Sequence, residues 1–116
     1  MRLMHEMSIA QNIIELVSDK ARSENAGRVS RIELAVGTLS GVMVDALRFG
    51  FEIVTKNSIA EGAELVIEEI QGEARCQDCN ITFPAESYIV RCPKCDGYVV
   101  DMICGQELKL KSIIID

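Results

Sequence analysis

The pattern of apolar residues in positions 8–24 predicts the first helix of the chain. In this segment, SIAQNIIELVSDKARSE, apolar residues recur at helical spacing: Ile9, Ile13, Leu16 and Val17. Ser8 with Gln11 three residues later fits a capping box, which satisfies amide groups at the start of a helix. We therefore expect the helix to begin at Ser8 and its apolar stripe to pack into the core.

The next three segments predict a strand, a second helix and another strand. Residues 29–36 (VSRIELAV) alternate apolar and polar positions, as a half-buried strand does. Residues 44–57 return to helical spacing, and the following EGAELVIEEI gives a turn at Gly62 and then a second strand. A strand, a crossover helix and a strand within one sheet normally form a parallel pair with a right-handed crossover.

The end of the chain resumes the strand pattern after an interruption. Residues 107–116 (ELKLKSIIID) are too apolar at positions 113–115 to stand alone in water, so we expect this strand to return to the first sheet. The pattern predicts the α+β fold class: a small three-stranded mixed sheet with two helices, plus an inserted module. We place the first domain at residues 1–71 and 106–116, and the inserted module at residues 72–105.

The inserted module carries two pairs of cysteines in the stretch CQDCNITFPAESYIVRCPKC. Their spacing is Cys76-x2-Cys79-x12-Cys92-x2-Cys95. Two residues between cysteines let one tight turn aim both sulfurs at a single ion, and two such turns complete a tetrahedral thiolate set that suits zinc. Because four cysteines leave no position for water, the pattern predicts a closed, structural site in a zinc-ribbon-like module. A rubredoxin-type iron site uses similar turns, whereas disulfides or a redox pair fit less well.

Composition limits the classes of partner. The chain has 116 residues, of which 48% are apolar and 26% charged, as in globular proteins. Its net charge of −6 argues against a general electrostatic attraction to nucleic acid or to an anionic membrane. Five cysteines without an apolar export signal indicate a reducing, cytoplasmic setting. The fifth, Cys104, lies in an apolar stretch and is expected to be a small buried hydrophobic residue.

The sequence contains no catalytic constellation. There is no phosphate-binding GxxxxGK[ST] motif, so any nucleotide hydrolysis would come from a partner. One histidine and a coordinatively saturated metal provide no pair of nucleophile and base. We therefore expect a protein that is not an enzyme. The single histidine, His5, precedes the first predicted helix, and on its own it indicates only an exposed side chain on a mobile chain end.

Five segments together resemble the HypA/HybF family, the nickel metallochaperones of [NiFe]-hydrogenase maturation. They are the MHEMSI start at residues 4–9, RIELAVG at residues 31–37, ALRFGFE at residues 46–52, the cysteine module, and the GQELKL strand at residues 105–110. The segment at residues 46–52 resembles the family's AL-x-FAFE helix. Each segment is modest alone, but they occur in order and span the chain from Met4. The resemblance implies a nickel carrier that holds zinc as a structural ion.

In that family, nickel binds at the extreme N-terminus through the histidine that follows the initiator methionine. The resemblance assigns this role to His5. The terminal amine, the intervening amide nitrogen and the imidazole can close chelate rings in one plane, and nickel(II) tolerates square-planar nitrogen ligation. The Glu6 carboxylate or its backbone amide could supply the fourth donor. The family's partners are the GTPase HypB and the precursor of the hydrogenase large subunit, and some relatives also serve urease maturation.

The sequence departs from the family pattern at the start. Residues 1–3 (MRL) precede Met4, so the α-amine of Met1 lies too far along the chain to join the chelate ring. Either translation starts at Met4, which we favour, or His5, Glu6 and backbone groups hold nickel alone. The alternative function is a zinc-ribbon adaptor that binds nucleic acid or protein, in which His5 is incidental.

Overall fold

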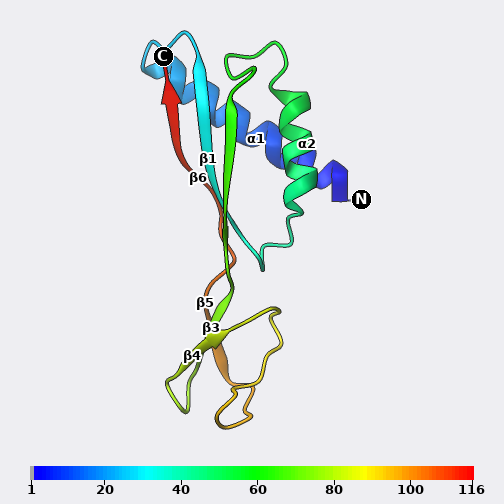
Figure 1. Cartoon of the computed structure of the whole chain (residues 1–116), viewed down its shortest axis with the longest axis vertical. Coiled ribbons are helices and arrows are strands. Elements are labelled where there is room, and N and C mark those ends of the chain that lie inside the picture. The colour runs from blue at the N-terminus through cyan, green and yellow to red at the C-terminus, as the bar shows by residue number, and fades with distance from the viewer. Residues whose placement is uncertain (1) are drawn as a thin grey trace. The chain divides into compact units, whose positions relative to one another are not determined.

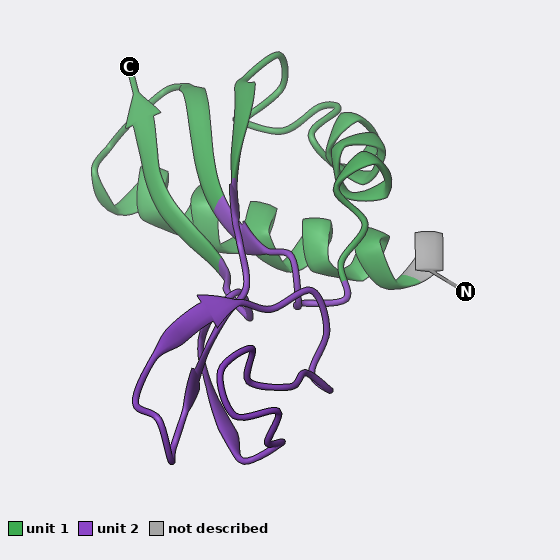
Figure 2. Cartoon of the chain, turned by 60° about the horizontal axis from the view of Figure 1, so that its bottom comes forward, with its two compact units in different colours: residues 1–34, 42–68, 109–116 green, residues 35–41, 69–108 purple. Residues whose placement is uncertain are grey.

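The computed structural model describes residues 2–116, with side chains from residue 5 onward. The elements in chain order are α1 (Arg2–Ser23), β1 (Val29–Gly37), α2 (Val44–Val54), β2 (Glu64–Ile70), β3 (Glu73–Cys76), β4 (Thr82–Pro84), β5 (Val100–Cys104) and β6 (Leu108–Ile115) (Figure 1). They form two compact units (Figure 2). The first unit comprises residues 1–34, 42–68 and 109–116, and the second comprises residues 35–41 and 69–108. Whether residues 72–105 fold as a domain of their own stays a prediction.

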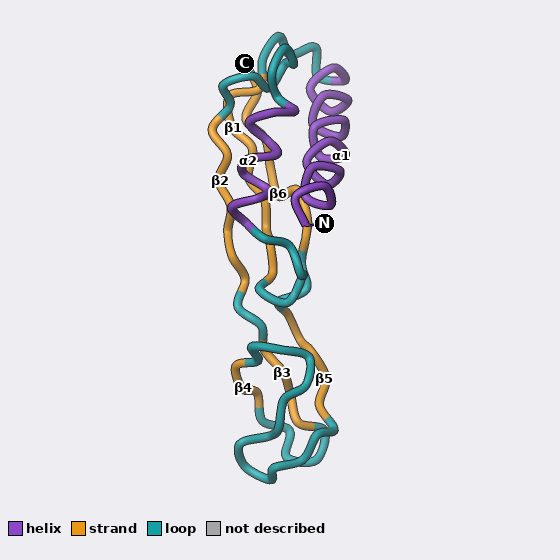
Figure 3. The backbone as a smooth tube through the Cα atoms, turned by 90° about the vertical axis from the view of Figure 1, so that its right-hand side faces the viewer, coloured by secondary structure: helices purple, strands orange, loops and turns teal. Residues whose placement is uncertain are grey.

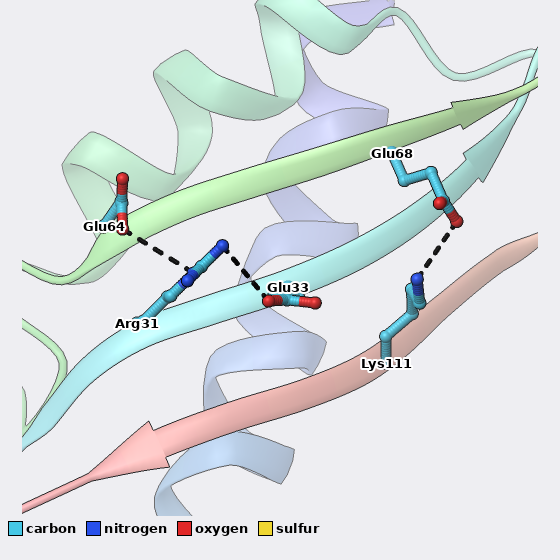
Figure 4. Close-up of polar contacts among 5 residues, drawn as sticks. All are labelled: Arg31, Glu33, Glu64, Glu68 and Lys111. Carbon is cyan, nitrogen blue, oxygen red and sulfur yellow. Dashed lines mark hydrogen bonds and ion pairs between the residues drawn. The ribbon is translucent and has the colours of Figure 1, made fainter.

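A mixed three-stranded sheet forms the first unit together with both helices. The strand order is β2-β1-β6, and β1 and β2 run in the same direction while β6 runs opposite to them (Figure 4). The α+β architecture and the return of the last strand to this sheet are therefore confirmed. The helices α1 and α2 pack against each other beside the strands (Figure 3).

The core of the first unit is mainly aliphatic and is built from α1, β1 and α2, with Ala60 from the turn that follows α2. Its α1 residues recur every three or four positions, so that one helix face is buried. The buried apolar residues of this unit are Ala10, Ile14, Val17, Ala21, Val29, Ile32, Leu34, Leu47, Phe51 and Ala60. The predicted stripe of α1 is right at Val17, which is fully buried, and wrong at Leu16, which is 55% exposed, and it did not include the fully buried Ala10.

Helix α1 also begins earlier than predicted. It starts at Arg2 instead of Ser8, so His5 lies inside the helix and not ahead of it. The residues before Ser8 are mostly strong helix formers and contain neither glycine nor proline. Glu6, one turn before Ala10, is fully buried and extends the buried face toward the N-terminus. The expectation of a non-helical chain end before the first helix is therefore wrong.

The opposite face of the sheet carries charged side chains. Arg31 lies 3.2 Å from Glu33 and 3.6 Å from Glu64, and Lys111 on β6 reaches across β1 to Glu68 on β2 at 3.1 Å (Figure 4). Partly exposed ion pairs of this kind typically contribute only about 0–1 kcal/mol each. They make this face polar, and the apolar core lies on the side of α1.

A second, antiparallel sheet with the order β4-β3-β5 organises the second unit. Its small core contains Ala74, Cys76, Phe83, Ala85 and Cys92. At one end of this unit three glycines let backbone segments pass very close to one another. A Cβ atom on Gly37 would lie 1.9 Å from the Gly105 carbonyl oxygen, and one on Gly72 would lie 2.4 Å from that of Ala85. No helix among residues 2–116 has the length and apolar character needed to cross a membrane.

Candidate metal centres

The structure brings the four predicted cysteines together in the second unit. Their sulfur atoms all lie within 4.8 Å of one another, and Cys76 Sγ and Cys95 Sγ are 3.6 Å apart. Sulfurs bonded tetrahedrally to zinc at about 2.3 Å are separated by about 3.8 Å. All five cysteines are free thiols. The array therefore has the donor atoms and nearly the dimensions of a closed four-thiolate zinc site.

Two equivalent turns aim these sulfurs inward. In the first, the Asn80 N–H donates to the Cys76 carbonyl oxygen at 2.8 Å, and in the second the Asp96 N–H donates to that of Cys92 at 2.8 Å. Asn80 and Asp96 have φ angles of 60° and 63°, a left-handed conformation that asparagine and aspartate tolerate. Backbone N–H groups also point at sulfur, from Cys79 to Cys76 Sγ and from Lys94 to Cys92 Sγ, both at 3.4 Å. Each Cys-x2-Cys pair is thus held by its own local turn.

The four thiols differ in how readily they ionise. Hydrogen bonding with the Cys95 sulfur, together with burial, raises the pKa of Cys79 to about 12. Burial acts to raise the pKa of Cys92, but N–H groups of Cys95 and Lys94 outweigh it and lower the pKa to about 7. The Gly97 N–H acts to lower the pKa of Cys95, yet contacts with the Cys76 and Cys92 sulfurs and burial raise it overall. Deprotonating several neighbouring thiols is unfavourable because their negative charges repel one another, and a bound divalent cation would offset that repulsion.

Cys104 lies outside the four-sulfur cluster. Its thiol donates to the Gln71 carbonyl oxygen at 3.3 Å and lies 3.8 Å from Glu73 Oε2. Burial, followed by the charges of Glu73 and Glu107, raises the pKa of Cys104. It is half-buried and not part of the apolar core. The cysteine is therefore an uncharged hydrogen-bond donor on β5.

The second candidate site lies at the start of α1. His5 is exposed, whereas the adjacent Glu6 has no exposed surface. Glu6 Oε2 accepts a hydrogen bond from the Met43 N–H at 2.9 Å, and Glu6 Oε1 is buried without a hydrogen-bond partner. Consecutive helical side chains point about 100° apart, so the imidazole and the carboxylate face different surroundings. The structure does not bring them together on one surface.

Comparison with known proteins shows the family of the chain. A family model described as "Hydrogenase/urease nickel incorporation, metallochaperone, hypA" matches residues 4–115. The chain belongs to the HypA family. Among its relatives, the hydrogenase maturation factor HypA of Chlorobaculum parvum is 48% identical and aligns over 97% of this chain and 100% of that protein. The HypA of Parabacteroides distasonis is 41% identical over 97% of both chains.

Solved HypA structures have the same fold. The solution structure of the Ni metallochaperone HypA from Helicobacter pylori matches with a TM-score of 0.67 at 25% identity, covering 95% of this chain and 96% of that one. A second HypA solution structure matches with a TM-score of 0.72 at 27% identity, covering 97% and 96%. The resemblance drawn from the five sequence segments is thereby confirmed over residues 4–115.

The contact between Glu6 and Met43 was not predicted from the sequence. Glutamate is rarely fully buried, and the two residues lie 37 positions apart in the chain. One signal was present, because Glu6 stands four residues before Ala10 on the face that continues into the core. Glu6 follows His5, the residue expected to bind nickel, in the chain, but its carboxylate is buried and bonded to Met43.

Proposed function

We propose that the chain binds Ni(II) through His5 and delivers it during hydrogenase maturation. The observation that carries the proposal is the position of an exposed histidine, the only one in the chain, next to Met4, where the match to the nickel-incorporation family begins. In a chain that begins at Met4, the α-amine, the amide nitrogen of His5 and its imidazole are adjacent donors. Nickel(II) accepts such a planar nitrogen set.

The helix start favours this chelate. The first four N–H groups of a helix have no carbonyl four residues back, so they are free of the intrahelical hydrogen bonds. In a helix that begins at Arg2, the amide of Glu6 has such a carbonyl, whereas in a chain that begins at Met4 it has none. The proposed fourth donor is the backbone amide of Glu6, because its carboxylate is buried and bonded to Met43.

Zinc completes the proposal as a structural ion. Cys76, Cys79, Cys92 and Cys95 would hold it, and it would cross-link the two turns of the second unit. Native mass spectrometry should then find one zinc per chain, and Cys76→Ser should release it while leaving the far-UV signal of the helices. A chain that keeps its module structure after zinc removal would contradict the structural role.

The family's role in hydrogenase maturation implies partners in that process. We propose that they are the GTPase HypB and the hydrogenase large-subunit precursor, with urease maturation proteins as further recipients. The free thiols of the cluster suit a reducing compartment, so the proposal places the protein in the cytoplasm. Delivery in this scheme needs no catalytic step by the chain itself.

Nickel titration of zinc-loaded protein tests the proposal. Two forms beginning at Met1 and at Met4 should be compared by equilibrium dialysis and by the absorption of planar Ni(II). We expect one tight equivalent in the Met4 form, lost in His5→Ala and retained in Gln11→Ala, a control at an exposed position of the same helix. Zinc content should not change. A His5→Ala variant that binds nickel like its parent would overturn the assignment.

A further inference from the structure

We infer that Glu6 is a positioning residue: its carboxylate ties the turn of α1 that carries His5 to the N-terminus of α2. The inference rests on the proposed nickel function and extends it to a residue that does not touch the ion through its side chain. The geometry that carries it is the 2.9 Å hydrogen bond from the Met43 N–H to Glu6 Oε2, made by a side chain with no exposed surface.

Glu6 contacts the N-terminal end of helix α2, which has no side-chain cap of its own. Met43, its N-cap residue, is extended with φ −86° and ψ 115° and makes no side-chain capping bond. A methionine side chain has no oxygen that could accept from the helix amides. The Glu6 carboxylate accepts instead from the N–H of Met43 itself, the residue before the first turn of α2, at the end of that helix where the dipole favours negative charge.

The backbone of Glu6 also lies near α2. An ideal Cβ atom on Gly50 would lie 3.6 Å from the Glu6 carbonyl oxygen, and 3.4 Å from both Met7 Sδ and Ala10 Cβ. The backbone of α2 therefore passes close to α1 at this turn, while the start of α2 holds the Glu6 side chain. Both features lie within the first unit. The hydrogen bond, made where the two helices are close, restrains the turn of α1 that carries His5.

The cost of this arrangement points to a role beyond folding. Glu6 Oε1 is buried without a hydrogen-bond partner, and burying such a group is unfavourable. A serine or asparagine at position 43 would cap the first-turn amides of α2 from its own sequence, with no need for a buried glutamate. Stabilising α2 alone therefore does not account for Glu6. Ordering the turn before nickel arrives does account for it, because less conformational entropy is then lost on binding.

The matched pair Glu6→Ala and Glu6→Gln tests this inference in nickel titrations of the zinc-loaded Met4 form. Glutamine keeps a carbonyl oxygen for the Met43 N–H, whereas alanine removes the acceptor. Loss of a group that orients a metal ligand typically weakens metal affinity roughly 10–100-fold. We expect a loss of that size in Glu6→Ala and near-parental affinity in Glu6→Gln. The Met43 amide should lose protection from hydrogen exchange in the alanine variant only, with or without nickel.

Two controls separate this inference from its alternatives. Val17→Ala shortens another fully buried α1 side chain away from this turn and should leave nickel affinity unchanged. Equal losses in Val17→Ala and Glu6→Ala would show a general stability effect, and equal losses in Glu6→Gln and Glu6→Ala would show a ligand or charge effect. Either result overturns positioning, as does parental affinity in Glu6→Ala. His5→Ala tests the proposed function separately. If the proposed function is wrong, this variant binds nickel like the parent, and if only the role of Glu6 is wrong, it does not.

Discussion

Replacing Gly50 with alanine should stabilise the first unit. Gly50 lies in the interior of α2 and is buried against α1. A new Cβ atom would meet Ala10 Cβ and Met7 Sδ at 3.4 Å and the Glu6 carbonyl oxygen at 3.6 Å. These are ordinary van der Waals distances at their lower end, so the helices need not separate. The family pattern AL-x-FAFE, which resembles residues 46–52, carries alanine at this position.

The magnitude follows from helix propensity and burial. Glycine in a helix interior is about 0.8–1.0 kcal/mol less favourable than alanine. Burying one more methyl group adds up to about 0.8 kcal/mol, and the close contact with α1 offsets much of that gain. We expect a net gain of about 1 kcal/mol in the free energy of unfolding, which raises the Tm of a domain this size by roughly 4–8 °C.

Thermal unfolding followed by far-UV circular dichroism reports this change, because both helices belong to the first unit. Zinc should be kept bound, so that the second unit is the same in both proteins. Gly62→Ala provides the matched control. Its Cβ would meet nothing within 4 Å, but φ is +78°, so alanine is strained there and should lower the Tm. A Gly50→Ala protein that melts at or below the parental temperature would refute the reasoning.

Three further predictions concern the second unit. Gly72→Ala should destabilise it by roughly 1–3 kcal/mol or more, seen as faster proteolysis, because the new Cβ would lie 2.4 Å from the Ala85 carbonyl oxygen. Apparent zinc affinity, measured by chelator competition, should fall as pH falls. Cys79 and Cys95 have raised pKa values, so zinc must displace at least two protons when it binds. A slope below two in log affinity per pH unit would contradict this. Cys104→Ser should leave zinc content unchanged by elemental analysis, because this thiol bonds to a backbone carbonyl outside the cluster.

The features predicted well from the sequence depend on local patterns. Strand β1 follows from alternation over a few residues, and its observed bounds, Val29–Gly37, extend the predicted ones by one residue. The cysteine turns follow from the two-residue spacing within each pair, and the left-handed residues after them stand at Asn80 and Asp96. In each case the residues that determine the structure are neighbours in the chain, so the pattern carries enough information.

The errors in α1 have a tertiary cause. The predicted stripe favoured large apolar residues such as Leu16, whereas the buried face is built partly from alanines, at Ala10 and Ala21. Small residues are needed where α2 approaches closely, as it does at Gly50, and hydrophobicity alone does not predict that approach. The start of the helix was missed because the first buried position among its described side chains, from residue 5 onward, is Glu6, a residue type that normally marks a surface.

The two candidate metal centres differ in what holds their ligands. Each cysteine pair is held by backbone hydrogen bonds that span four residues, so the ligand geometry is largely set within each turn. The start of α1 instead depends on a tertiary contact, the bond between Glu6 and Met43, while His5 itself stays exposed. A change at the start of α2 can therefore alter the proposed nickel site without any change in the zinc turns. A carrier needs this difference, because it must release one ion while keeping the other.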